Sequence, residues 1–99
     1  MVVIDPDLRE LVPGFLAHRR EDVDVIMSGA QSGDYDSILH LAHRIKGDGG
    51  GYGFEAISDF GRQLEEAAKA RNPTAIVTTA QDLLHYLDNL KVVYRSSRR

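Results

Sequence analysis

The stretch from His43 to Phe54 reads HRIKGDGGGYGF and follows a segment, SILHLA, whose apolar residues recur at helical spacing. Glycine clusters of this kind are typical of turns and of loops that bind phosphate. A P-loop, however, has its lysine after the last glycine and then a serine or threonine, whereas Lys46 precedes the glycine cluster. The dinucleotide-binding spacing GxGxxG also fails, because Tyr52 or Phe54 stands where the last glycine would be. Neither nucleotide-binding motif is present.

If the helix continues into this stretch, His43 lies on its solvent side. At about 100° per residue, the core side of the helix is made by four residues, Ile38, Ala42, Ile45 and Gly49. His43 lies roughly 120° from the centre of that side. His40, Gly47 and Gly50 fall close to His43, and Lys46 falls between the two sides. We therefore expect His43 to be exposed rather than buried in the core.

The glycines of this helix need a physical reason, because each interior glycine costs up to about 1 kcal/mol relative to alanine. Gly47 and Gly50 lie beside His43, where bare backbone would let another macromolecule approach the imidazole. Gly49 and Gly53 lie on or near the core side, where we expect them to let helices pack closely. Where the helix ends stays open, because any of several glycines could end it.

The composition fits one small domain covering residues 1–99. Without cysteine there is no disulfide and no thiolate metal site, which fits a reducing compartment. The formal net charge of -3 gives no general attraction to nucleic acid, and we interpret the basic end, RSSRR, as a solvated terminus. No apolar run approaches the roughly 20 residues of a membrane span, and no signal peptide is recognisable. We expect a cytoplasmic protein without membrane contact.

Proline, glycine and capping residues divide the chain into segments of helical length. The segments expected to be helical are 6–12, 13–31, 35 to the glycine cluster, 54–68 and 73 to about 94. Asp5 and Asp34 are the predicted N-caps of the first and third segments. No segment alternates as a strand would. The predicted fold class is all-α, an antiparallel up-and-down four-helix bundle with a short additional N-terminal helix.

The motif AHRIKGDGGGYGF, with Leu64-Glu65 one helix later, resembles the signature of histidine phosphotransfer (HPt) domains. That signature is an Ala-His pair, then Leu or Ile followed by Lys-Gly, a run of small residues, a glycine ten residues after the histidine, and a Leu-Glu or similar pair on the next helix. The matching positions are Ala42, His43, Ile45, Lys46, Gly47, Gly53 and Glu65. The resemblance implies an HPt four-helix bundle in which His43 is the phosphorylated residue.

One position departs from the commonest pattern and leaves the subtype open. The residue 22 positions after the histidine is often glutamine in phosphorelay members, and here it is Glu65. A glutamate there, together with HxIKGxxGxxGF, is also similar to the phosphotransfer domain of chemotaxis histidine kinases. In that alternative, a linked ATP-binding kinase domain phosphorylates the histidine.

Phosphoryl transfer to histidine needs a ring nitrogen with a free lone pair, approached in line with the leaving oxygen. We predict that Glu65 accepts the Nδ1 hydrogen of His43 and leaves Nε2 as the nucleophile. Lys46, one turn from His43, is predicted to pair with the phosphoryl oxygens. His40 and His43 form an i, i+3 pair that could hold a metal, but further ligands are missing from the pattern, so we expect no metal and no cofactor.

The resemblance implies that the partner is the receiver domain of a response regulator, or a hybrid sensor histidine kinase that carries one. The residues expected to form the docking rim are His40, Arg44, Gly47, Asp48 and Gly50. We predict a monomer, because the transfer face must stay open, and a carrier rather than an enzyme, because nothing in the sequence binds ATP or Mg²⁺.

The predicted function is that of a phosphorelay intermediate. His43 accepts a phosphoryl group from one receiver phospho-aspartate and passes it to another. A helical interaction module without chemistry would explain the bundle but not the His-Lys-Gly arrangement.

Overall fold

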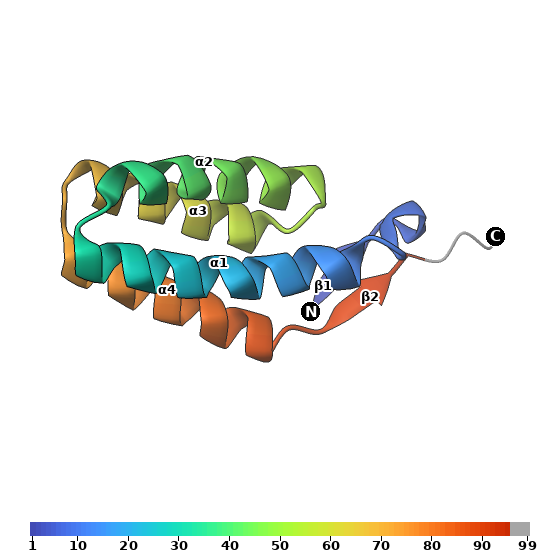
Figure 1. Cartoon of the computed structure of the whole chain (residues 1–99). Coiled ribbons are helices and arrows are strands. Elements are labelled where there is room, and N and C mark those ends of the chain that lie inside the picture. Colours follow the sequence, from blue (N-terminus) through green and yellow to red (C-terminus); the bar gives the residue numbers. More distant parts are fainter. Residues whose placement is uncertain (96–99) are drawn as a thin grey trace.

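The computed structural model describes residues 1–95, so that most of the basic end RSSRR lies outside the described residues. Four helices make up most of the fold, as predicted: α1 (Val12–Ser32), α2 (Tyr35–Gly51), α3 (Glu55–Lys69) and α4 (Pro73–Asp88). Successive helices run back and forth along one axis, as the order of colours shows (Figure 1). Within residues 1–95, none of the helices is long and apolar enough to cross a membrane.

The core lies between the four helices, and each helix contributes a fully buried isoleucine. Ile26, Ile45, Ile57 and Ile76 are all 0 % exposed, one from each of α1 to α4 in that order. Packing of such apolar faces is the main source of stability in a helical bundle. Apolar residues that recur at helical spacing in the sequence therefore form the core.

Short connections between the helices are fixed by side-chain and glycine caps. Asp34 accepts a hydrogen bond from the Ser37 backbone N–H at 3.3 Å, as expected of the N-cap of α2. Gly33, which ends α1, has a φ of +75°. Because residues with a Cβ rarely adopt this left-handed conformation, glycine is favoured at that turn.

Gly53 does not serve helix packing, so the role predicted for it is wrong. Helix α2 ends at Gly51, and Gly53 follows it with a φ of +86°. The Phe54 N–H donates to the Gly49 carbonyl at 2.7 Å, and the Gly53 N–H donates to the Gly50 carbonyl at 3.1 Å. This pair of bonds is the Schellman motif, which needs a left-handed residue after the helix. Gly53 thus ends α2 and turns the chain into α3.

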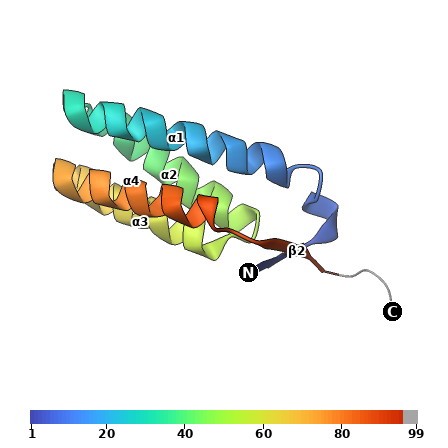
Figure 2. The ribbon, with the colours of Figure 1, turned by 90° about the horizontal axis from the view of Figure 1, so that it is seen from below.

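Two short strands occur where only helix and loop were predicted. Strands β1 (Val2–Ile4) and β2 (Val92–Tyr94) pair in parallel, with Val3 opposite Val93. They lie side by side beyond one end of the helices (Figures 1 and 2). The prediction that the last helix reaches Tyr94 is therefore wrong. The β-branched residues of both segments favour strand, but three residues are too few to show alternation.

The additional N-terminal helix is shorter than predicted. Instead of a helix from Pro6 to Val12, the structure has one turn of 3-10 helix, Pro6–Leu8. Asp5 caps it as expected, accepting a hydrogen bond from the Asp7 N–H at 2.9 Å. A single turn of this kind is typical of a connector, here between β1 and α1.

We predict that β1 stabilises the whole fold through Ile4. This side chain is 1 % exposed, and its Cδ1 lies 3.5 Å from where a Cβ on Gly53 would stand, so β1 packs against the α2–α3 turn. Ile4→Ala should lower the free energy of unfolding by about 2–4 kcal/mol, measured by urea denaturation. Val3→Ala, at a neighbouring residue that is 58 % exposed, is the control and should change it by less than about 0.5 kcal/mol. Equal effects of the two substitutions would contradict the prediction.

Candidate functional site

His43 lies in the middle of α2 with its imidazole turned to solvent, as the sequence predicts. Its side chain is 73 % exposed. His43 Nδ1 lies 3.1 Å from Glu65 Oε2, which belongs to α3. The side chain of Glu65 is only 13 % exposed, so it is mostly buried beside the exposed imidazole. The structure thus brings together the two residues that the sequence places 22 positions apart.

The same carboxylate also binds Lys46. Lys46 Nζ lies 2.8 Å from Glu65 Oε1, while His43 is on the other carboxylate oxygen. Lys46 was predicted to pair with phosphoryl oxygens; in the structure, where no phosphoryl group is present, it pairs with Glu65. An ammonium group has three hydrogens to donate, so this ion pair leaves donors free. The phosphoryl contact of Lys46 stays a prediction.

The contacts with Lys46 and His43 favour the ionised form of Glu65. Hydrogen bonds from Lys46 and then from His43 hold the pKa of this carboxyl below its ordinary value, although partial burial opposes the effect. Glu65 is therefore ionised near neutral pH and can only accept hydrogen bonds. Because an acceptor at 3.1 Å favours a hydrogen on Nδ1 of a neutral ring, Nε2 keeps its lone pair.

Two glycines let the backbones of α2 and α3 approach each other closely, at two positions along the helices. A Cβ on Gly49 would stand 2.6 Å from the Ser58 backbone N, closer than real Cβ atoms approach, so its predicted packing role is confirmed. A Cβ on Gly61 would stand 2.5 Å from the Lys46 backbone N. In addition, Ser58 Oγ donates to the Lys46 carbonyl at 2.8 Å. The sequence analysis missed Gly61, although a glycine inside the strongly amphipathic segment 55–69 was a signal for it.

The residues predicted for the docking rim differ in their surroundings. His40, Arg44, Gly47 and Gly50 are exposed. A Cβ on Gly47 would meet nothing within 4 Å, so the surface beside His43 is bare there. His40 and Arg44 line a shallow groove of about 330 Å³ between α1 and α2, together with Val25, Ser37 and Leu41.

Asp48 is engaged within the protein rather than free on the rim. Its carboxylate accepts a hydrogen bond from Arg19 of α1 at 3.2 Å. Arg19 is buried, and it also pairs with Asp22 at 2.7 Å. Burial raises the pKa of the Asp22 carboxyl, an effect that Arg19 opposes. This cluster of three charges joins α1 to α2, and the charged run HRREDVD gave no sign of a buried arginine.

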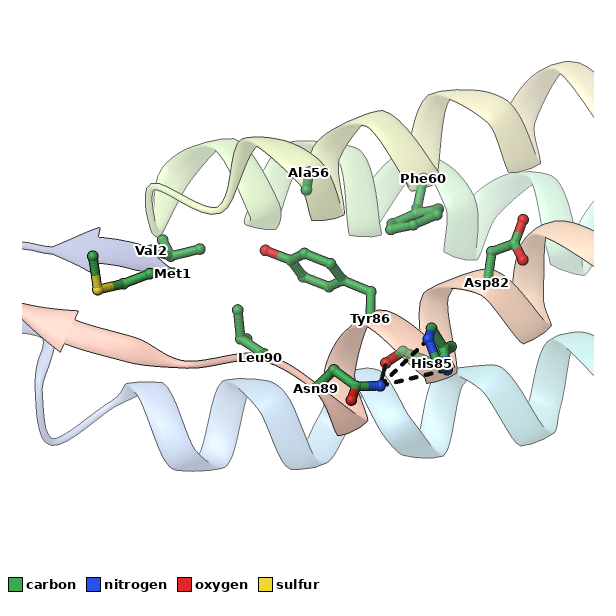
Figure 3. A pocket seen from close by; sticks show the side chains of 9 residues that line it. All are labelled: Met1, Val2, Ala56, Phe60, Asp82, His85, Tyr86, Asn89 and Leu90. Carbon is green, nitrogen blue, oxygen red and sulfur yellow. Dashed lines mark hydrogen bonds between the residues drawn. The ribbon is translucent and has the colours of Figure 1, made fainter.

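A second cavity lies on the other side of α3. It has a volume of about 680 Å³ and is lined from α3, α4 and the first two residues, with Phe60 and Tyr86 along its wall (Figure 3). Phe60 and Glu65 are five residues apart on α3, so they point roughly 140° away from each other. The cavity is therefore separate from His43. In the part of the chain that the structure describes, no three His, Cys, Asp or Glu side chains cluster as metal ligands.

The four-helix fold and this site define a class of helical domains that carry an exposed histidine beside a glutamate of the next helix. Residues 10–92 match the family model described as Hpt domain, and the chain belongs to the Hpt domain family. No curated protein and no solved structure matches the chain. Hpt domains are phosphocarrier modules that interact with receiver domains and kinases, and this places the chain in phosphotransfer of two-component signalling.

We predict that Glu65 makes the stability of the fold depend on pH. Because its pKa is lowered in the folded protein, its stabilising contribution is complete above the pKa of the unfolded chain, and it is lost as pH falls through the folded pKa. The free energy of unfolding, measured by denaturant titration from pH 6 to pH 3, should fall less in Glu65→Gln than in the wild type. Glu66→Gln, which removes the exposed neighbouring carboxylate, is the matched control. Parallel curves for Glu65→Gln and wild type would exclude this role.

Proposed function

We propose that this chain is a phosphorelay intermediate. His43 accepts a phosphoryl group from the phospho-aspartate of one receiver domain and passes it to the aspartate of another. The observation that carries the proposal is the exposed imidazole whose Nδ1 lies 3.1 Å from the ionised Glu65. We further propose that residues 1–99 form one domain, an antiparallel up-and-down bundle, that acts as a cytoplasmic monomer.

The transfer step follows from the orientation of the ring. The Nε2 lone pair attacks phosphorus in line, a P–N bond forms, and the bond from phosphorus to the aspartate oxygen breaks, with its electrons leaving on the carboxylate. The hydrogen on Nδ1 stays on the ring, which thereby gains positive charge. Glu65 accepts from this N–H and balances that charge. Lys46, already held beside Glu65, has hydrogens left for a phosphoryl oxygen.

The alternative is the phosphotransfer domain of a chemotaxis-type kinase. It is favoured by Glu65 in place of the glutamine that is common in phosphorelay members. In this alternative the donor is ATP in a linked kinase domain, while the chemistry at His43 is the same. The two candidates differ in the donor that phosphorylates the chain.

We propose that the receiver docks over α1 and α2 beside His43. The groove lined by His40, Leu41 and Arg44 begins within one turn of His43. Val25 of α1, which also lines this groove, is 56 % exposed and offers the receiver an apolar contact. Gly47 and Gly50 leave the approach to the imidazole open.

The function is tested by incubating the protein with a phosphorylated receiver domain and, separately, with a chemotaxis-type kinase domain and ATP. We expect base-stable, acid-labile phosphate on the wild type and none on His43→Gln. His85→Gln, at an exposed histidine of α4, is the matched control and should still be labelled. Label from the receiver supports the relay, and label from the kinase alone supports the alternative. Label that persists in His43→Gln would refute both.

The docking surface gives a separate prediction. Val25→Asp should weaken receiver binding about tenfold, measured by calorimetry, because the new carboxylate would lose its water in an apolar contact. The control is Leu11→Asp, also at an exposed apolar residue but about 21 Å along α1 from Val25. If both variants bind the receiver as the wild type does, the receiver docks elsewhere.

A further inference from the structure

We propose that Gly61 is a positioning residue for phosphotransfer. Its missing side chain lets α3 approach α2 closely enough for Glu65 to hold His43 in the reactive tautomer. This role rests on the function proposed above, and it concerns a buried residue that makes no contact with the phosphoryl group.

The closest approach between the two helices occurs at Gly61. A Cβ there would stand 2.5 Å from the backbone N of Lys46, 2.8 Å from its Cα and 2.9 Å from the carbonyl oxygen of Ala42. These are backbone atoms of a helix, so they cannot swing aside as the end of a flexible side chain can. Alanine at this position therefore has to push the two helices apart.

The site lies one turn further along the same contact. Gly61 faces Lys46, and four residues on, Glu65 faces His43. The distance of 3.1 Å from His43 Nδ1 to Glu65 Oε2 is already near the upper end for an N–H···O bond. If α3 moves a few tenths of an ångström away from α2 near Gly61, the distance from Nδ1 to Oε2 exceeds that range. The hydrogen of the neutral ring is then free to move to Nε2, which loses its lone pair.

Gly49 serves as the comparison, because it also lets α2 and α3 approach closely, at another position along the helices. A Cβ on Gly49 would stand 2.6 Å from the Ser58 N, so alanine is about equally crowded there. However, Gly49 lies six residues beyond His43, about 9 Å along α2. Gly49→Ala should therefore disturb the packing without moving Glu65 from His43 as far as Gly61→Ala does.

The test is a double-mutant cycle of Gly61→Ala and Glu65→Ala, with the rate of His43 phosphorylation by a phosphorylated receiver as the readout. Rates are measured at a temperature at which circular dichroism shows every variant folded. We expect Gly61→Ala to slow the reaction about threefold to tenfold, the effect of losing one hydrogen bond of this kind. In the Glu65→Ala background it should change the rate by less than about twofold, because the contact is already lost. Gly49→Ala should stay within about twofold of the wild type.

A second measurement reports the tautomer directly. In ¹⁵N spectra of the His43 ring, Gly61→Ala should move the hydrogen from Nδ1 toward Nε2, as Glu65→Ala does, and Gly49→Ala should not. Glu65→Asp, which shortens the side chain by one methylene without crowding the helices, should reproduce both the spectral change and the slower rate. If Gly61→Ala does not fold, Glu65→Asp still tests whether the distance between Glu65 and His43 controls the tautomer and the rate.

The positioning role is wrong if Gly61→Ala reacts at the wild-type rate, or if it slows the reaction equally with and without Glu65. An equal effect of Gly49→Ala, or wild-type behaviour of Glu65→Asp, would also overturn it. If the wild type accepts no phosphoryl group from any donor, the proposed function fails. The ¹⁵N spectra would then still decide whether Gly61 places Glu65 against His43.

Discussion

The close backbone contact between α2 and α3 is the constraint on which the site depends. Gly49 and Gly61 remove the side chains that would hold these helices apart, and Ser58 Oγ donates to the Lys46 carbonyl across the contact at 2.8 Å. Glu65 follows Gly61 by one turn of α3, and its Oε2 lies 3.1 Å from His43 Nδ1. The cost of placing glycine inside helices is offset by burial along the contact.

Helix α2 packs against α3 on one side and α1 on another, and a third side is exposed to solvent. On the α3 side the glycine contact fixes its backbone, and on the α1 side the buried Arg19 binds Asp48 and Asp22. Because Arg19 is buried, loss of its acidic partners would leave its charge uncompensated, so the α1–α2 contact depends on them. The face that carries His43 lies between these two contacts. In the proposed function, this rigid support would hold the imidazole of His43 in place for the approaching receiver domain.

Much of the fold could be predicted from the sequence because helices are local. The boundaries of α1 to α3 and the start of α4 lie close to those predicted, since capping residues such as Asp34 and apolar periodicity act within a few residues. The strands were missed because their pairing is not local. Val2 and Val92 pair across nearly the whole chain, and three residues carry no period of their own. Gly53 was placed on a helix face, because only the backbone conformation shows that α2 has already ended.

By itself, the sequence determined four amphipathic helices, an exposed His43 and the residue types around it, because spacing along a helix sets which side a residue occupies. Only the tertiary structure decided that Lys46 and His43 share the carboxylate of Glu65, that Asp48 is bound by Arg19, and that Gly61 sets the approach of α3. These contacts depend on the distance and register between helices, which the packing of the whole core fixes and no local pattern records.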